Sequence, residues 1–403
     1  MAHLTPPTCP RPLLALAASG VALCAVAACD EGASGGLAWG APACAPLVES
    51  CLDRMAGCAV EGGVAACAPC PAGTAPVRPL GACEALAAPA LSHTFGAWTL
   101  EPGDEVSSLC ESWVLDNDEE LFVNAVELAS PGGVHHHVLF FVPEDHRGWP
   151  TGTWLDCYAQ GFNELEVALA GGILVASSTE VPSEFQRFGS GAAVRIPPRS
   201  RVIAAAHLLN SSAERVTTSI RASLHTVAAV EVEARLVPGQ LVVPGLTVPP
   251  EGASTFSGRC DVAATYEAFA AAPLAMRVHG FLPHVHPSVT AMEVRVVGGP
   301  EDGRLLVDLG AYEAAPLGHV FDPPVDLAGA TGLSLSCSYE GALAQDPAWG
   351  HGHEEKCETL LYLESDMAFA GVILPAAAPR VEPDGQVFEG ACQGLGFPYD
   401  DGE

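Results

Sequence analysis

The residues best suited to chemistry in this chain are histidines in three groups. They are the run His135, His136 and His137, the single His207, and the set His279, His284 and His286. Neutral imidazole is a common metal ligand, and copper binds such sites more tightly than the other divalent metals of its series. The histidines therefore predict a metal centre, with copper as the expected ion.

The spacing within each group decides which histidines can act together. His284 and His286 are two residues apart, so on a strand they point to the same face. The consecutive His135–His137 point to alternate faces of a regular strand. Two of them can share a metal only at a strand end or a bulge, which Gly132 and Gly133 make feasible.

Each group also has a purely structural explanation. A pair such as His284 and His286 is common on strand surfaces, and His207 lies in an apolar stretch where a histidine can belong to the core. The run His135–His137 could bind stray metal without a function. Spacing alone leaves both interpretations open.

Composition excludes some partners and indicates the class of structure. The 403 residues include 17 Lys+Arg against 48 Asp+Glu, a formal net charge of −31. Such a charge repels phosphate, so we expect no nucleic-acid partner and no binding to anionic lipid. The 42 Gly and 34 Pro favour short elements and many turns over long helices.

The N-terminus has the features of an export signal. Arg11 precedes the short apolar run 13–23, and Val26-Ala27-Ala28-Cys29 resembles a bacterial lipobox, which predicts a signal peptide over 1–28 and lipidation of Cys29. The alternative is ordinary cleavage and a soluble secreted protein. In the first case the chain is a membrane-anchored lipoprotein of the cell envelope that touches the membrane only through its lipid.

Fifteen cysteines fit an oxidising compartment. Removing the signal and the lipidated Cys29 leaves twelve, an even number, and six of these fall within 44–85 after a Gly- and Ala-rich tether at 29–43. We expect a small module with three disulfide bonds, whose connectivity and partner the sequence does not give. Cys67-Ala-Pro-Cys70 could instead be a redox or metal motif, although no nearby histidine supports that.

The rest of the chain reads as all-β. Short apolar or alternating runs, separated by Pro, Gly and Asn turns, predict strands at 121–128, 137–142, 192–196, 201–207, 230–237, 292–297, 333–339 and 359–363. Turn residues at Val237-Pro238-Gly239 and Val248-Pro249-Pro250 fall near the middle. We therefore expect two β-sandwich domains, at 92–228 and 229–397.

Several motifs in one order resemble a known family. They are Leu109-Cys110-Glu-Ser-Trp, Val134-His135-His136, His207 with Asn210, Pro249-Pro250 before Cys260, Phe281-Leu-Pro-His284-Val-His286, Leu335-Ser-Cys337-Ser-Tyr and Glu355-Lys356-Cys357. Over roughly 95–395 the chain is similar to the copper type II ascorbate-dependent monooxygenases, which include peptidylglycine α-hydroxylating and dopamine β-monooxygenases. The resemblance does not cover the six-cysteine module. It implies two tandem jelly-roll sandwiches, each holding one copper.

The resemblance also implies roles for individual residues. The first copper, which passes electrons from ascorbate, would be held by His135, His136 and His207, with His137 where the family often has Met. The second copper, which binds O2 and hydroxylates a small-molecule substrate, would be held by His284 and His286 as the catalytic ligands.

One family ligand is replaced. Where the family has a Met immediately before a cysteine, this chain has Lys356 before Cys357. A protonated ammonium has no lone pair for copper, whereas a thioether is a soft ligand suited to Cu(I). Either the second site has lost oxygen chemistry, or His351 or His353 serves as its third ligand.

The same resemblance implies the disulfide bonds of the sandwiches and limits the substrate. Cys337 with Cys357 and Cys260 with Cys392 match family pairs, which leaves Cys110 with Cys157. Leu282 and Leu360 stand where amidating members hold a substrate carboxylate with Arg and Tyr, so a peptidylglycine substrate is not expected.

The resulting hypothesis is a copper monooxygenase that uses ascorbate or another one-electron donor, O2 and an unknown small molecule. The alternatives are a non-catalytic copper-binding surface lipoprotein, in which only the first site is strong, and a structural scaffold.

Overall fold

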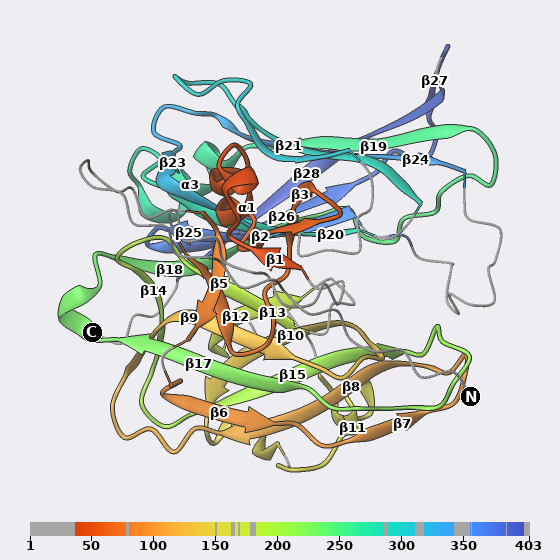
Figure 1. The fold of residues 1–403 in the computed structure, drawn as a ribbon. Helices are drawn as coiled ribbons and strands as arrows, with labels where there is room; N and C mark the ends of the chain where they lie inside the picture. The colour runs from red at the N-terminus through yellow and green to blue at the C-terminus, as the bar shows by residue number, and fades with distance from the viewer. Residues whose placement is uncertain are drawn as a thin grey trace, which may run out of the picture. The chain divides into compact units, whose positions relative to one another are not determined.

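A computed structural model describes the following residues of the chain: 37–77, 80–86, 88–149, 151–162, 166–167, 170–177, 183–285, 288–310, 318–341, 355, 357–383 and 385–398. The proposed signal peptide, Cys29, His286, His351, His353 and Lys356 lie outside these residues. Residues 37–403 belong to one compact unit. It is an all-β structure of two β-sandwiches preceded by a disulfide-rich module, as the sequence predicts (Figure 1).

The first sandwich has two facing layers. One is the sheet in the order β11-β8-β15-β10-β12, and the other contains β6, β17, β9, β13 and β14. Its strands are β6 (Leu91–Thr94), β7 (Trp98–Leu100), β8 (Glu105–Val114), β9 (Leu121–Ala129), β10 (Val134–Pro143), β11 (Leu155–Asp156), β12 (Gly172–Ser177), β13 (Ser183–Arg187), β14 (Ala192–Ile196), β15 (Ser200–Leu209), β16 (Val216–Thr218) and β17 (Arg221–Val227). Alternate residues such as Val126, Leu139 and Ala204 fill the space between the layers. This is the pattern expected of strands buried on one face.

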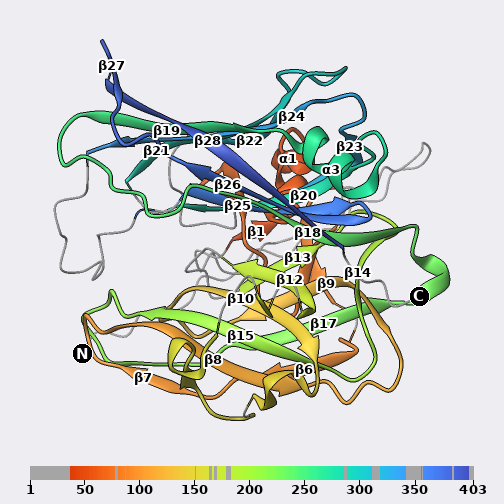
Figure 2. The same cartoon turned by 180° about the vertical axis from the view of Figure 1, so that it is seen from behind.

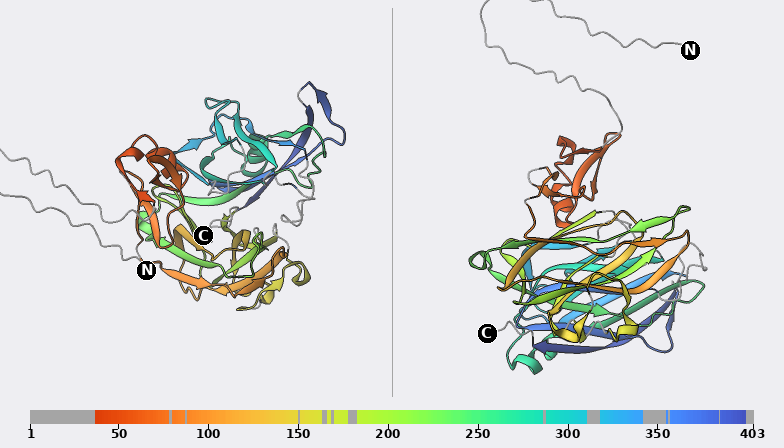
Figure 3. Two further views of the ribbon diagram at one scale, coloured as in Figure 1. Left: turned by 45° about the vertical axis from the view of Figure 1, so that its right-hand side comes forward. Right: turned by 90° about the horizontal axis from the view of Figure 1, so that it is seen from below.

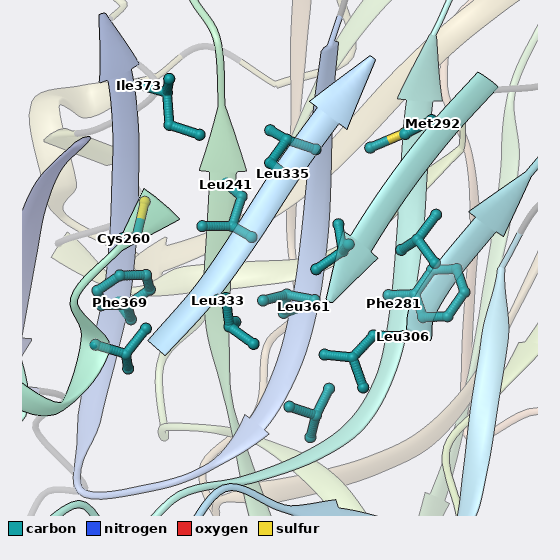
Figure 4. Close-up of a cluster of buried hydrophobic side chains, with 14 of the residues drawn as sticks. Leu241, Cys260, Phe281, Met292, Leu306, Leu333, Leu335, Leu361, Phe369 and Ile373 are labelled. Atoms are coloured by element: carbon teal, nitrogen blue, oxygen red, sulfur yellow. The ribbon is translucent and has the colours of Figure 1, made fainter. Parts of the chain in front are cut away.

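The second sandwich follows. Its strands are β18 (Ala234–Val242), β19 (Ala253–Cys260), β20 (Arg277–Val285), β21 (Val289–Val297), β22 (Leu305–Leu309), β23 (His319–Asp326), β24 (Gly332–Glu340), β25 (Cys357–Glu364), β26 (Met367–Leu374), β27 (Arg380–Glu382) and β28 (Gly385–Pro398). The layer β22-β21-β24-β19-β28 faces β18, β25, β20 and β23. Leu241, Met292, Leu335 and Leu361 are among the buried residues of its core, shown in Figure 4. A helix, α3 (Val262–Ala270), is capped by the Asp261 carboxylate.

The two sandwiches share apolar contacts and a parallel strand pair. Leu282, Leu360 and Tyr362 of the second sandwich belong to the buried cluster of the first. β14 also pairs with β18 through Ala192 and Ala234. Figure 2 shows β14 and β18 neighbouring each other. These contacts matter for the site below, because Leu282 lies on the strand that carries His284.

Two details of the sequence prediction were wrong. The run 230–237 is not one strand, because residues Ala229–Glu231 form a 3-10 turn (η4) in which the Glu231 carboxylate accepts a hydrogen bond from the Ala228 backbone N–H at 2.9 Å. Pro238-Gly239 does not form a turn between the sandwiches and lies inside β18. Proline is tolerated there because it falls between the pairing with β14, which ends at Arg235, and the pairing with β26, which begins at Gly239.

The N-terminal module contains β1 (Ala38–Trp39), η1 (Pro42–Cys44), α1 (Val48–Asp53), β2 (Gly57–Glu61), β3 (Val64–Ala68), β4 (Thr74–Val77) and β5 (Ala82–Ala85). Its disulfides are Cys44–Cys58, Cys51–Cys67 and Cys70–Cys83. Cys67 and Cys70 thus have different structural partners, so the CxxC pair is not a redox dithiol here. Most of the buried core of the module is cystine, as expected where the apolar core is too small to fold alone.

The sandwiches carry three further disulfides, Cys110–Cys157, Cys260–Cys392 and Cys337–Cys357. The last two are the pairs that the family resemblance implies, and the first is the pair that this leaves. Within the described residues, no helix has the length and apolar character needed to cross a membrane.

Candidate metal centre

The strand β10 carries the consecutive histidines, and its register is irregular at that point. Val134 lies opposite Leu208 of β15, whereas His136 lies opposite His207, so His135 is the extra residue of a bulge. Gly132 and Gly133 precede it with φ of 118° and 76°, and the Gly133 carbonyl accepts a hydrogen bond from Leu209. The bulge predicted from the two glycines is confirmed. It turns His135 and His136 toward the same side.

The rings of His135, His136 and His207 form a compact cluster. One ring nitrogen from each histidine lies within 4.8 Å of the corresponding nitrogens of the other two. The ring centroids of His135 and His207 are 5.1 Å apart, and those of His136 and His207 are 4.8 Å apart. His207 Nδ1 is 3.0 Å from His136 Nε2. A metal ion bound by all three would replace this direct contact between imidazoles.

Glu105 orients one member of the cluster. It begins β8, where it pairs with Leu209 of β15, and its carboxylate accepts a hydrogen bond from His207 Nε2 at 2.5 Å. The Glu105 side chain is only 5% exposed. With a proton on Nε2, the Nδ1 atom is left with its lone pair toward the cluster, an arrangement common behind metal-binding histidines. Sequence reasoning missed Glu105, which nothing distinguishes among 48 acidic residues until the strand register is known.

His284 belongs to the second sandwich, and its ring lies against the histidine cluster of the first. Its ring centroid is 4.6 Å from that of His136. His284 lies on β20 opposite Glu358, and the next residue, Val285, lies opposite the disulfide-bonded Cys357. The structure thus brings together four of the five predicted ligands. The fifth, His286, lies outside the described residues. His279, which was not a predicted ligand, pairs with the Glu364 carboxylate at 3.0 Å.

His137 is separated from the cluster by the pleat of β10. It is 4% exposed, and neither of its ring nitrogens has a hydrogen-bond partner among the described residues. Burial in these surroundings lowers its pKa to about 4, so the ring is neutral at pH 7. It is buried in the first sandwich, on the strand that carries two of the candidate ligands.

Further buried polar groups lie near His137. Ser177 of β12 pairs with it, and Ser177 hydrogen-bonds the Glu184 side chain, which also accepts a hydrogen bond from Gln186 at 2.7 Å. Burial raises the pKa of Glu184 to about 7. The Tyr362 side chain of β25 is also buried, which raises its pKa. These residues were not singled out from the sequence, because their polarity becomes unusual only once their burial is known.

The donor set of the cluster fits copper. Three imidazole nitrogens converge, one of them backed by a buried carboxylate. Such nitrogen sites are well suited to copper, and also accept zinc with lower affinity. Cys110 is close in sequence to Glu105, but it forms a disulfide with Cys157 and therefore cannot bind a metal.

Comparisons with known proteins give no family. No protein-family model matches the chain, and no curated protein matches it. The chain matches solved structures that include the STIV MCP, at 10% identity and TM-score 0.29 over 68% of this chain and 95% of that one. The major capsid protein P2 from bacteriophage PM2 shares 9% identity at TM-score 0.30 over 68% and 97%. The PBSX exported protein XepA shares 8% at TM-score 0.15 over 72% and 94%. At these scores the likenesses carry no argument about either the fold or the function of this chain.

Proposed function

We propose that this chain is an exported copper monooxygenase that binds its first copper ion through His135, His136 and His207. The observation that carries the proposal is the convergence of three imidazoles within 4.8 Å on two hydrogen-bonded strands. Holding three ligands ready in the fold lowers the ordering cost of metal binding. Copper bound there would supply one-electron redox chemistry between a donor such as ascorbate and O2.

The residues around the cluster have separate tasks in this proposal. Glu105 holds His207 with Nδ1 toward the metal. His284 brings the second sandwich within 4.6 Å of His136, between ring centroids, and so provides a ligand for a second copper close to the first. The overall reaction would convert a substrate C–H bond and O2 into an alcohol and water, using two electrons from the donor and two protons from solvent.

Two positions that hold a substrate carboxylate in the resembling family are apolar in this chain. Leu282 lies two residues before His284, on the same face of β20, and pairs with Leu360 of β25. Both side chains are almost fully buried, with exposed fractions of 3% and 9%. Two leucines cannot pair with a carboxylate, so the proposed substrate is an uncharged or cationic small molecule and not a peptidylglycine.

A second candidate function is copper binding without catalysis. Lys356 occupies the position where the resembling family has a methionine ligand, next to Cys357. A lysine there disfavours a second copper because its ammonium cannot donate a lone pair. In that case the chain would hold copper at the first site alone, on a surface lipoprotein if Cys29 is lipidated.

Copper stoichiometry separates these functions. Wild type, His136→Ala and Lys356→Met would be loaded with copper, desalted and analysed for metal, and then assayed for ascorbate-dependent O2 uptake. The monooxygenase is supported by two coppers in wild type and by uptake. The binding protein is supported by one copper in wild type rising to two in Lys356→Met. Wild type that retains no copper, or retains it equally in His136→Ala, contradicts both.

A further inference from the structure

The N-terminal module contacts both sandwiches. Its strand β4 places Ala75 in a buried cluster with Ala125 and Phe185 of the first sandwich. The Gly73 backbone N–H donates to the carboxylate of Glu127, a residue of β9 that is 4% exposed. Helix α1 lies against β23 of the second sandwich. In Figure 3 the module, in red and orange, lies beside strands of both.

Met55 occupies an unusual position in the module. It follows α1, and its backbone φ is +56°, the left-handed conformation in which glycine normally ends a helix. A side chain costs about 1 kcal/mol in that conformation. A methionine at such a position is therefore expected to make compensating contacts through its side chain.

Those contacts involve both sandwiches at once. The Met55 Sδ accepts a hydrogen bond from the Arg187 backbone N–H of β13 at 3.2 Å. At Gly318, just before β23, a Cβ atom would lie 2.5 Å from the Met55 Cε and 3.2 Å from the Leu282 Cδ1. The methyl groups of Met55 and Leu282 thus border the same small space, which only a glycine at 318 leaves open.

The contact between Met55 and Leu282 lies on the strand that carries His284. Leu282 and His284 lie on the same face of β20, and His284 is the residue that reaches His136. Arg187 ends β13, which pairs with β9, the strand that also carries Glu127. A rigid, disulfide-bonded module joined to β13 and β9 on one side and to β20 on the other resists their separation.

We propose that the cysteine-rich module is an intramolecular clamp that uses Met55 to hold the second sandwich against the first, and so keeps His284 beside His136. The clamp acts between protein groups and needs no metal. It therefore stands or falls independently of the copper function.

Pulsed electron paramagnetic resonance on the full-length, metal-free protein tests the clamp. Spin labels on noncanonical amino acids at Thr217 and Asp308, exposed residues of the first and second sandwich, report the distance between them. Met55→Gly removes the side chain but keeps a residue that prefers the left-handed backbone, so the module is expected to fold. We expect a narrow distance distribution in wild type whose width roughly doubles in Met55→Gly, because the sandwiches become free to move.

Three further variants sharpen the test. Gly318→Ala inserts a methyl group against Met55 and is expected to broaden the distribution as well, whereas Gly310→Ala, whose Cβ would meet nothing within 4 Å, is not. Asp116→Gly relieves the same left-handed backbone at an exposed residue far from the module contact in sequence and should leave the distribution narrow. Wild-type widths in both Met55→Gly and Gly318→Ala would overturn the clamp, as would equal broadening in the Asp116→Gly and Gly310→Ala controls.

Discussion

The two sandwiches present their histidines in different ways. In the first, His135, His136 and His207 lie on neighbouring strands in the middle of a sheet, and Glu105 on the next strand orients one of them. In the second, the described structure contributes His284, near the end of β20, while the other predicted ligands lie beyond that strand. A ligand set fixed by strand register is organised by the fold itself. The second set combines His284, near the end of a strand, with residues far away in the sequence, so strand register alone does not fix its geometry.

This difference leads to an unequal expectation for the two sites. The first site should bind metal without large rearrangement, whereas the proposed second site includes Lys356, at the position where the resembling family has a methionine ligand.

Removing a ligand of the first cluster should abolish tight copper binding. His136→Ala leaves only two imidazoles to bind the metal. Loss of a group that merely hydrogen-bonds a metal ligand costs about 10–100-fold in metal affinity, so we expect loss of a ligand itself to lower copper affinity by more than about 100-fold. Competition titration with a chelator of known copper affinity measures it. His225→Ala, on β17 in the facing layer, is the matched control and should bind copper as wild type does. Equal affinity in wild type and His136→Ala would refute the assignment.

The two sandwiches also differ in the partners and the exposure that they give one of their carboxyl groups. Glu364 of the second faces Arg277 and His279, whereas Glu184 of the first has only neutral partners. Burial raises the pKa of Glu184 from 4.5 to about 7. Between these pH values the carboxyl group is protonated in the folded protein but ionised in the unfolded chain, so the free energy of unfolding falls as pH rises from 4.5 to 7. Replacing it by glutamine removes that loss.

Relative to wild type, Glu184→Gln should therefore gain about 3 kcal/mol in free energy of unfolding between pH 4.5 and pH 7 and no more above it. Denaturant unfolding at pH 4.5, 6 and 8 measures the difference between the two proteins. A difference that is independent of pH would show that Glu184 is not held protonated by burial.

The carboxylate behind His207 should contribute less than a ligand. Glu105→Ala leaves His207 free to rotate and to change tautomer, and we expect about a 10–100-fold loss of copper affinity. Glu105→Gln keeps an oxygen acceptor and should retain part of the affinity. Glu101→Gln, at a carboxylate that pairs with Arg215 in an exposed position, is the control. If Glu105→Ala alters stability but leaves both copper affinity and the copper paramagnetic resonance spectrum unchanged, Glu105 has no positioning role.

Much of the first site could be predicted from the sequence, because it depends on local rules. The glycines before His135 predict the bulge, and His207 lies in an apolar run typical of a strand. Glu105 could not be predicted, because its contact with His207 comes from the pairing of strands a hundred residues apart. The contact between His136 and His284 likewise depends on the packing of one sandwich on the other. Met55 resembles an ordinary surface methionine until its φ and neighbours are known.

The smallest expected effect is at His284. If the first copper needs only His135, His136 and His207, His284→Ala should change its affinity by less than about ten-fold, since a neighbouring ring contributes less than a ligand. The same titration measures it. A loss as large as that of His136→Ala would mean that the two sandwiches share one four-histidine site, and the contrast between them would disappear.

The central claim is that copper binds between His135, His136 and His207. Anomalous diffraction from crystals of the copper-loaded protein, collected on both sides of the copper absorption edge, tests it most directly. We expect a strong anomalous peak within bonding distance of one ring nitrogen from each of the three histidines, with Glu105 still hydrogen-bonded to His207. A copper peak elsewhere with none at this cluster, or no peak in the loaded crystals, would contradict the claim.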